Sequence, residues 1–209
     1  MRYIKTLGYF AVLTCSTLLI SACSTLPSTQ IPASANPNLS WQDYQTALQS
    51  LQHWEASGIV GVRMNNHGDS ANFIWRQNKD EFYLQIYGPL GIGSTIFSGR
   101  ANDVTMTDSD GIKTHATSLR ALMDKKLGWH LPIDGLYYWV RGLPEPGMPY
   151  KQSLNSQGLS AMIIQNQWQT QFENYALFEN QYPLAQKIRM QYGDLLQLTA
   201  IIKLWKINQ

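Results

Sequence analysis

The side chain best placed for identifiable chemistry in this sequence is the thiol of Cys23. It follows Ile20, Ser21 and Ala22, at the end of an apolar run that begins at Phe10. A branched apolar residue and two small residues before a cysteine are typical of the bacterial lipobox. The thiolate is the nucleophile that accepts a diacylglyceryl group, and the small residues give a peptidase access to the bond after Ala22. We therefore expect a mature chain that begins at Cys23 and carries S-diacylglycerol and N-acyl groups there.

The segment before Cys23 has the composition of an export signal. Arg2 and Lys5 supply positive charge, and the apolar run that follows is too short to span a bilayer. A chance cysteine in an ordinary export signal is the alternative. The next residue is Ser24, whereas Asp at that place retains lipoproteins in the inner membrane of enterobacteria-like organisms. The sequence thus favours a lipid-anchored protein of the outer membrane, with its domain in the periplasm.

No other group of residues has the spacing of a catalytic or metal site. The four histidines are dispersed, and the sequence contains no HExxH, Gly-x-Ser-x-Gly or phosphate-loop pattern. Asp108, Asp110 and Gly111 match only the start of a calcium loop, so an Asp-Gly hairpin turn is the simpler interpretation. We expect no enzymatic activity, no metal and no cofactor.

Charge and cysteine content bear on the possible partners. The chain of 209 residues has 16 Lys and Arg against 14 Asp and Glu, and loss of Arg2 and Lys5 with the signal leaves 14 of each. No basic patch suggests a nucleic-acid partner. Cys15 leaves with the signal and Cys23 is acylated, so we expect no disulfide. The chain shows no heptad repeat that would favour oligomers, and a monomer is expected.

The composition predicts three segments. Residues 1–22 form the signal that is removed, residues 23–39 carry the lipid and a Pro-rich linker, and residues 40–209 form one domain. At roughly 3.1 Å per residue, an extended linker of this kind spans on the order of 50 Å. The linker would allow the domain to stand away from the membrane.

Apolar spacing predicts one helix at the start of the domain and two more within it. The first covers Ser40–His53, with Ser40 as its N-cap and Asp43 three residues later. The others cover Ser118–Leu127 and Asp134–Arg141. Runs rich in branched and aromatic residues, separated by turn residues, predict an antiparallel meander with strands at Ile59–Met64, Ala71–Gln77, Phe82–Tyr87, Thr95–Ser98, Val104–Thr107, Lys113–Ala116, Leu159–Gln165, Gln167–Tyr175, Ala185–Gln191 and Leu195–Ile207.

The strand at Phe82–Tyr87 is apolar or aromatic on both faces, and Ala71–Trp75 is so less completely. A sheet with one wet face alternates more cleanly. The simplest arrangement is a mainly β fold in which helices lie in the hollow of a strongly curved antiparallel sheet. The periodicity leaves open whether the interior is filled or hollow.

Several stretches together resemble the LolB family of outer-membrane lipoprotein receptors. Their order and spacing carry the resemblance more than any single piece, and they extend over almost all of the mature chain. They are the lipobox at Cys23, the strand Phe73–Gln77, the loop Gly88–Gly91, the segment Leu131–Pro144, and the C-terminal stretches Ile188–Met190 and Ile201–Ile207.

The resemblance implies an open, incomplete β-barrel closed by helices around a hydrophobic cavity for acyl chains. It also implies that the protein accepts lipoproteins from the periplasmic carrier LolA and releases them into outer-membrane lipid. A protruding loop, here Pro89 and Leu90, would help delivery. The added Gly91-Ile92-Gly93 makes this loop longer than the family pattern, so Ile92 is a second candidate for that role. The alternative is a tight turn that happens to carry a leucine.

Ten large apolar side chains are candidates for the lining of the cavity, although such stripes more often fill a core. They are Phe73, Trp75, Phe82, Leu84, Ile86, Leu122, Met123, Leu136, Trp139 and Val140. A competing hypothesis is a lipid-anchored outer-membrane assembly protein that acts through protein contacts and has no lipid cavity. A packed interior without an opening would favour this hypothesis of an assembly protein.

Overall fold

The computed structural model describes residues 40–64, 67–91, 93–127 and 133–207. These residues belong to one compact unit, Ile31–Gln209. The predicted lipid site at Ala22 and Cys23, the linker at 23–39 and Ile92 lie outside the described residues. In the part of the chain that is described, no helix is both long and apolar enough to cross a membrane.

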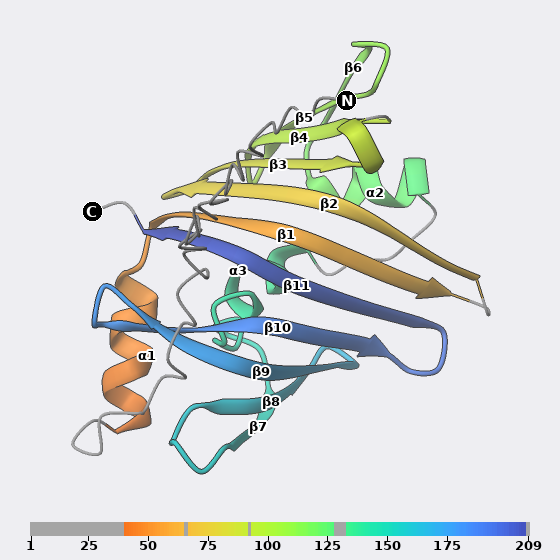
Figure 1. The fold of residues 1–209 in the computed structure, drawn as a ribbon. Coiled ribbons are helices and arrows are strands. Elements are labelled where there is room, and N and C mark those ends of the chain that lie inside the picture. The colour runs from red at the N-terminus through yellow and green to blue at the C-terminus, as the bar shows by residue number, and fades with distance from the viewer. Residues whose placement is uncertain (1–39, 65–66, 92, 128–132, 208–209) are drawn as a thin grey trace, which may run out of the picture. The chain divides into compact units, whose positions relative to one another are not determined.

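One antiparallel sheet of 11 strands forms most of the domain, in the order β6-β5-β4-β3-β2-β1-β11-β10-β9-β8-β7 (Figure 1). Its edges, β6 and β7, do not pair, so the barrel is open, which confirms the predicted fold class. The strands are β1 (His53–Met64), β2 (His67–Asn78), β3 (Glu81–Tyr87), β4 (Thr95–Arg100), β5 (Asp103–Thr107), β6 (Lys113–Ala116), β7 (Tyr150–Leu154), β8 (Ser160–Gln165), β9 (Trp168–Phe178), β10 (Tyr182–Tyr192) and β11 (Leu196–Ile207).

Several strands are longer than predicted, because backbone pairing continues past the apolar pattern. β1 begins at His53 and pairs along its whole length with β2. Its register with β11 shifts at Gly58, where an added Cβ would lie 1.9 Å from the carbonyl oxygen of Ile201. Only glycine permits this bulge. The edge strand β7 was not predicted, because it has one pairing partner and its sequence, Tyr-Lys-Gln-Ser-Leu, shows no apolar stripe.

The first helix, α1 (Trp41–Ser50), begins as the sequence predicts. The side chain of Ser40 accepts a hydrogen bond from the amide of Asp43, and the Asp43 carboxylate accepts one from the Ser40 amide at 2.7 Å. This capping box satisfies two amides that have no partner within the helix. The helix ends at Ser50 and not at the predicted His53, because Leu51 is extended and His53 starts β1.

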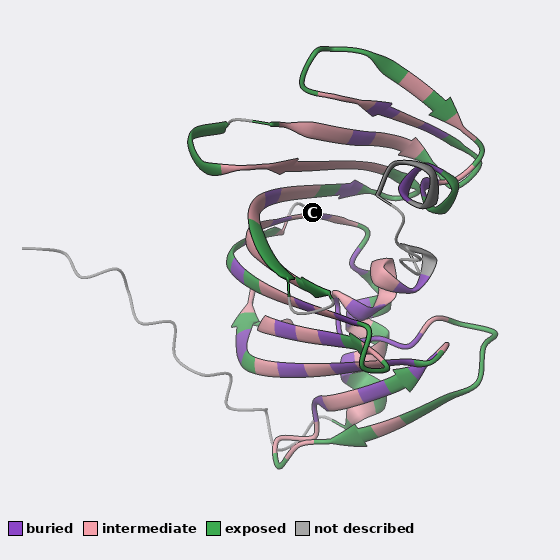
Figure 2. Ribbon diagram, turned by 90° about the vertical axis from the view of Figure 1, so that its right-hand side faces the viewer, coloured by how far each residue is buried: buried purple, intermediate pink, exposed green. Residues whose placement is uncertain are grey.

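Helices α2 (Leu119–Leu127) and α3 (Ile133–Trp139) lie with α1 on the concave face of the sheet (Figures 1 and 2). The α3 helix ends earlier than the predicted Arg141, because the chain turns at Gly142, whose φ is +79°. The amide of Leu143 donates to the Tyr138 carbonyl at 3.1 Å, and that of Gly142 to the Trp139 carbonyl at 2.8 Å. These two bonds form a Schellman cap, which favours glycine at this position.

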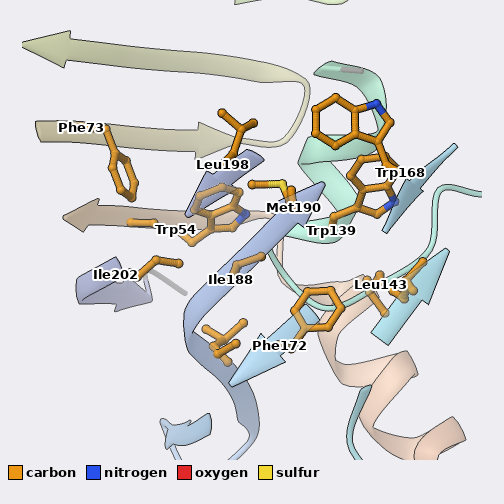
Figure 3. Packing of buried hydrophobic residues seen from close by; sticks show 14 of the residues in the cluster. Trp54, Phe73, Trp139, Leu143, Trp168, Phe172, Ile188, Met190, Leu198 and Ile202 are labelled. Atoms are coloured by element: carbon orange, nitrogen blue, oxygen red, sulfur yellow. The ribbon is translucent and has the colours of Figure 1, made fainter. Parts of the chain in front are cut away.

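The sheet has two unlike inner regions. In the first, called the packed side, helices α1 and α3 cover β8–β10. Trp139 lies beside Trp168 and Leu143 there (Figure 3), and its indole N–H donates to Gln165 at 2.9 Å. Apolar side chains of this region are almost fully buried, and they include Leu48, Trp139, Leu143, Leu159, Ile163, Trp168, Phe172 and Leu184.

The buried, positively charged side chain of Arg141 bridges the two helices of the packed side. The Arg141 guanidinium donates to the carbonyls of Leu48 and Leu51, at 3.0 Å each, and to that of Tyr137 at 3.2 Å. It also lies 4.2 Å from the ring centre of Tyr137. Burial lowers the pKa of Arg141, and the carbonyls and the ring face compensate for part of the lost hydration. Arg141 thus joins the C-terminal end of α1 to α3.

Candidate functional site

The second inner region, called the hollow side, is the concave face of β1–β4 with the adjoining part of β11 and β10, and it contains an apolar cavity of about 290 Å³. Three polar residues, Asp69, Ser70 and Thr95, lie at the starts of β2 and β4 and mark one end of the cavity. The other residues that line it are apolar: Val60, Val62, Ala71, Phe73, Trp75, Leu84, Ile86, Phe97, Met123, Leu136, Val140, Ile188, Met190, Leu198, Ala200 and Ile202.

Strand register places the large side chains of β2, β3 and β4 side by side. Phe73 pairs with Ile86, and Trp75 with Leu84, which in turn pairs with Phe97. Residues that pair directly in an antiparallel sheet point to the same face. Together they form one apolar wall of the cavity.

Small residues on the neighbouring strands leave the space in front of this wall. Val60 of β1 pairs with Ala71 on one side and with Ala200 on the other, and Ala200 pairs with Ile188 of β10. This cross-strand row thus contains two alanines, one valine and one isoleucine, whereas the packed side contains the indoles of Trp139 and Trp168. Met123 of α2 and Leu136 of α3 line the cavity, while Trp139, the largest residue of α3, lies on the packed side.

The structure separates the ten predicted lining residues into three groups. Phe73, Trp75, Leu84, Ile86, Met123, Leu136 and Val140 line the apolar cavity. Phe82 lines a second, neighbouring cavity. Leu122 and Trp139 line neither, because both are fully buried among other core side chains.

Sequence reasoning missed the wall contributed by β1, β10 and β11. Its inward residues alternate with outward ones at a period of two, as at Leu198, Ala200 and Ile202 or at Ile188 and Met190. That alternation was available in the sequence. It distinguishes inward from outward residues but not a cavity wall from a filled core.

The second cavity, of about 580 Å³, adjoins the first and shares Trp75, Leu84 and Leu136 with it. Its character is mixed, since polar side chains lie among aliphatic and aromatic ones. The indole N–H of Trp75 donates to Gln77 at 3.1 Å, and Gln77 donates to the Lys79 carbonyl at 2.8 Å. The polar residues that line it are Gln52, Gln77, Lys79, Asp80, Tyr137, Tyr138 and Glu145.

Among the residues that line this second cavity, Tyr138 is a neutral hydrogen-bond donor. Burial raises the pKa of Tyr138, with a smaller contribution from Tyr137, so its hydroxyl stays protonated at neutral pH. The rings of Tyr137 and Tyr138 meet edge to face, with centres 4.9 Å apart. The two adjoining cavities therefore differ in character. The first is apolar, and the second offers hydrogen-bond partners.

The predicted delivery loop joins β3 to β4 directly beside the apolar cavity. A single turn, η1 (Pro89–Gly91), places Leu90 at the surface with 98% of its area exposed. The backbone of Leu90 has φ +59° and ψ +19°, a left-handed conformation that costs a non-glycine residue about 1–2 kcal/mol. The strand residues on either side of the loop, Ile86 and Thr95, pair with each other and line the cavity.

The predicted hairpin turn at Asp108 is present. Its carboxylate accepts hydrogen bonds from the amides of Asp110, at 3.0 Å, and Ile112, at 2.9 Å. Both bonds hold the turn between β5 and β6 in place. Among the described residues, no three His, Cys, Asp or Glu side chains form a group suited to a metal ion.

Comparisons with known proteins agree with this geometry. The family model described as "Outer membrane lipoprotein LolB" matches residues 52–205. An outer-membrane lipoprotein LolB from Francisella tularensis subsp. tularensis (strain WY96-3418) is 35% identical over 204 residues, which cover 98% of each chain. Another, from Stutzerimonas stutzeri (strain A1501), is 33% identical over 195 residues, with 93% of this chain and 94% of that one covered.

A solved structure shares the fold at low sequence identity. The crystal structure of a LolA superfamily protein from Nitrosomonas europaea superposes with a TM-score of 0.55 and 7% identity. The match covers 82% of this chain and 94% of that one. The likeness concerns the fold alone.

Proposed function

Because the chain belongs to the LolB family of outer-membrane lipoproteins, we propose that it accepts lipoproteins from the periplasmic carrier LolA and passes them to the outer membrane. The observation that carries this proposal is the apolar cavity on the hollow side. The cavity offers hydrocarbon surface in a protein that the water-filled periplasm surrounds. The competing hypothesis, an assembly factor without a lipid cavity, does not account for that hollow.

The physical problem that such a receptor solves is the exposure of acyl chains to water. Exposure costs roughly 0.8 kcal/mol per CH₂, so one chain of about sixteen carbons costs on the order of 12 kcal/mol. Unassisted transfer through water is therefore negligible. Side chains such as Trp75, Leu84 and Leu198 shelter the chains without any covalent step. Cargo moves forward when the receptor binds it more tightly than the carrier does, and the membrane more tightly still.

The anchor and the cavity have separate roles in this proposal. Acyl groups on Cys23 hold the protein at the outer membrane, with the domain on the periplasmic side. The Pro-rich linker then allows the cavity to meet a carrier that arrives through the periplasm. A domain without its lipid retains the cavity and should still accept cargo.

The Leu90 loop supplies the delivery step. A fully exposed leucine gains roughly 1.5–3 kcal/mol when it enters hydrocarbon. That gain is enough for transient contact with a bilayer but not for stable anchoring. The strained backbone at Leu90 keeps this side chain outside the core, beside the cavity from which cargo leaves.

A transfer assay tests the proposal in two stages. Purified LolA loaded with a lipoprotein is mixed with residues 24–209, and cargo on each protein is measured before and after liposomes are added. We expect capture from LolA by both the parent and Leu90→Glu, and delivery to liposomes by the parent only. Leu204→Glu, on the exposed outer face of β11, is the matched control and should behave as the parent.

Two results would contradict the proposal. If residues 24–209 take no cargo from LolA, the receptor function is wrong. If Leu90→Glu delivers cargo at the parent rate, the role of the loop is wrong while the receptor function stands.

A further inference from the structure

The large apolar side chains that are most exposed among the described residues lie at three separate turns. They are Leu90 at 98%, Leu195 at 61% and Ile112 at 60%, and Tyr150 follows at 47%. A single exposed leucine is ordinary on a protein surface. Three of them on turns, where polar residues and glycine are usual, call for a common explanation.

Sheet topology places these three turns at the same end of the sheet. All neighbouring strands are antiparallel, so β1, β3, β5 and β10 run in one direction. The turns that follow β3, β5 and β10 therefore share one end, and they carry Leu90, Ile112 and Leu195. Met64, the exposed last residue of β1, lies at this end too, and so does the polar turn after β8, with Asn166 and Gln167. In Figure 1 the β3–β4 and β10–β11 turns lie toward the right.

The turns at the opposite end have a different composition. They follow β2, β4, β7 and β9, and they expose no large apolar residue: Lys79 and Asp80, then Ala101 and Asn102, then residues 155–159, of which Leu159 is buried, then Glu179, Asn180 and Gln181. Among the described turns, those with an exposed large apolar residue therefore lie at one end of the sheet.

Hydrogen bonds within each turn hold the apolar side chains outward. The Asp108 carboxylate accepts from the Ile112 amide at 2.9 Å, and the Leu195 amide donates to the Tyr192 carbonyl at 3.2 Å. At the third turn, the Gly91 amide donates to the Gly88 carbonyl at 3.2 Å. These side chains are exposed on well-defined turns, and packing within the domain does not explain their apolar character.

We propose that this end of the sheet, with Leu90, Ile112 and Leu195 as its apolar tips, contacts the lipid bilayer at three points. The proposal rests on the receptor function above and extends the contact beyond the Leu90 loop. The apolar cavity ends here too, at Ser70 and Thr95. Cargo would then leave the cavity at the surface where the protein touches lipid.

A bilayer fits this surface better than a protein partner does. The tips lie on separate hairpins, with exposed polar residues such as His67 and Asp69 between them. A stable protein interface has a continuous apolar core, and these tips do not form one. Separate tips enter a bilayer independently, while the adjacent charges of Asp110, Lys113 and Asp194 remain among the headgroups.

Site-specific fluorescence on the full lipidated chain tests the proposal. Ile112→Cys and Leu195→Cys are labelled with an environment-sensitive fluorophore in vesicles of phosphatidylethanolamine and phosphatidylglycerol. Asn102→Cys and Asn180→Cys, on turns at the opposite end, are the matched controls. Cys15 leaves with the signal and the sulfur of Cys23 is acylated, so the introduced thiol is the only one that reacts, and the parent should take up no label.

We expect blue-shifted emission, and quenching by nitroxide-labelled lipid, at positions 112 and 195 but not at 102 and 180. Equal, water-like emission at all four positions would overturn the proposal. A second variant, Ile112→Asp with Leu195→Asp, should slow delivery to vesicles about tenfold while capture from LolA is unchanged. Delivery at the parent rate would count against the contact.

The same samples separate the two proposals. Capture of cargo without lipid contact at positions 112 and 195 contradicts the three-point contact alone. Lipid contact without capture contradicts the receptor function and leaves the surface assignment in place.

Discussion

The packed side and the hollow side belong to one sheet, yet their burial patterns differ. Along β9, Trp168, Thr170 and Phe172 are buried and alternate with half-buried residues. Along β3, every residue from Phe82 to Tyr87 is half-buried, with no alternation. Both strands carry large apolar side chains, so composition does not explain the contrast.

The contrast comes from what lies over each inner face. Helices α1 and α3 bring Leu48 and Trp139 against β8–β10, and the interior there is filled. On the hollow side the adjacent residues Val60, Ala71 and Ala200 are small, and apolar area stays accessible in the cavity. Each Å² of that area yields roughly 25 cal/mol when it is later buried. The apolar area of the hollow side therefore remains available to stabilise a bound ligand. The corresponding area of the packed side is already buried in the folded domain.

The largest expected effect is a difference between the two sides in how far truncation of a side chain lowers the free energy of unfolding. Trp139→Ala should lower the free energy of unfolding by about 3–5 kcal/mol, because it empties a filled region. Leu84→Ala on the hollow side should cost clearly less, since Leu84 is only half-buried. Urea unfolding followed by circular dichroism measures both. Equal losses would mean that the hollow side is as well packed as the other.

The next effect concerns cargo binding, which should depend on the free space of the hollow side. Ala200→Phe places a ring in the row between Val60 and Ile188 and should reduce cargo capture at least about tenfold, while unfolding changes little. Capture from LolA and thermal unfolding are the two measurements. Ala121→Phe, at an exposed position of α2, adds the same atoms elsewhere and should leave capture unchanged.

The smallest effect concerns the outer face, where the two sides are alike. Glu55 accepts from Lys206 at 2.7 Å and from Arg76 at 2.8 Å on the hollow side. On the packed side, Glu173 pairs with Lys187 at 2.9 Å and Arg189 at 2.8 Å. Exposed ion pairs contribute less than about 1 kcal/mol, so Glu55→Gln and Glu173→Gln should have similarly small effects on unfolding at neutral pH.

The effect at Glu55 has a defined pH dependence. Hydrogen bonds from Lys206 and then Arg76 lower the pKa of Glu55 below its unfolded value. Its contribution to stability is therefore present above the unfolded pKa of about 4.3 and is lost as the pH falls through the folded pKa. The difference between parent and Glu55→Gln should vanish in strongly acidic buffer. A difference that persists there would assign the effect to packing.

Local features of the fold were predictable from the sequence. The capping box at Ser40, the Asp108 turn and most strands follow from side-chain chemistry within a few residues. The edge strand β7 was not, because its pairing depends on a neighbour and not on its own apolar pattern. The β2 and β3 side of the cavity was predicted, and its β1, β10 and β11 side was not.

The sequence by itself determined the family, the antiparallel strands and the apolar character of the interior, since each depends on residue types in local order. Only the tertiary structure decided which apolar residues surround a space. Leu136 and Val140 line the cavity while Trp139, between them, is packed. The space exists because register sets Ala71, Val60 and Ala200 side by side, although Val60 and Ala200 are far apart in the chain. A cavity forms where side chains from distant parts of the sequence are too small to fill the space between them, and no local sequence pattern encodes that.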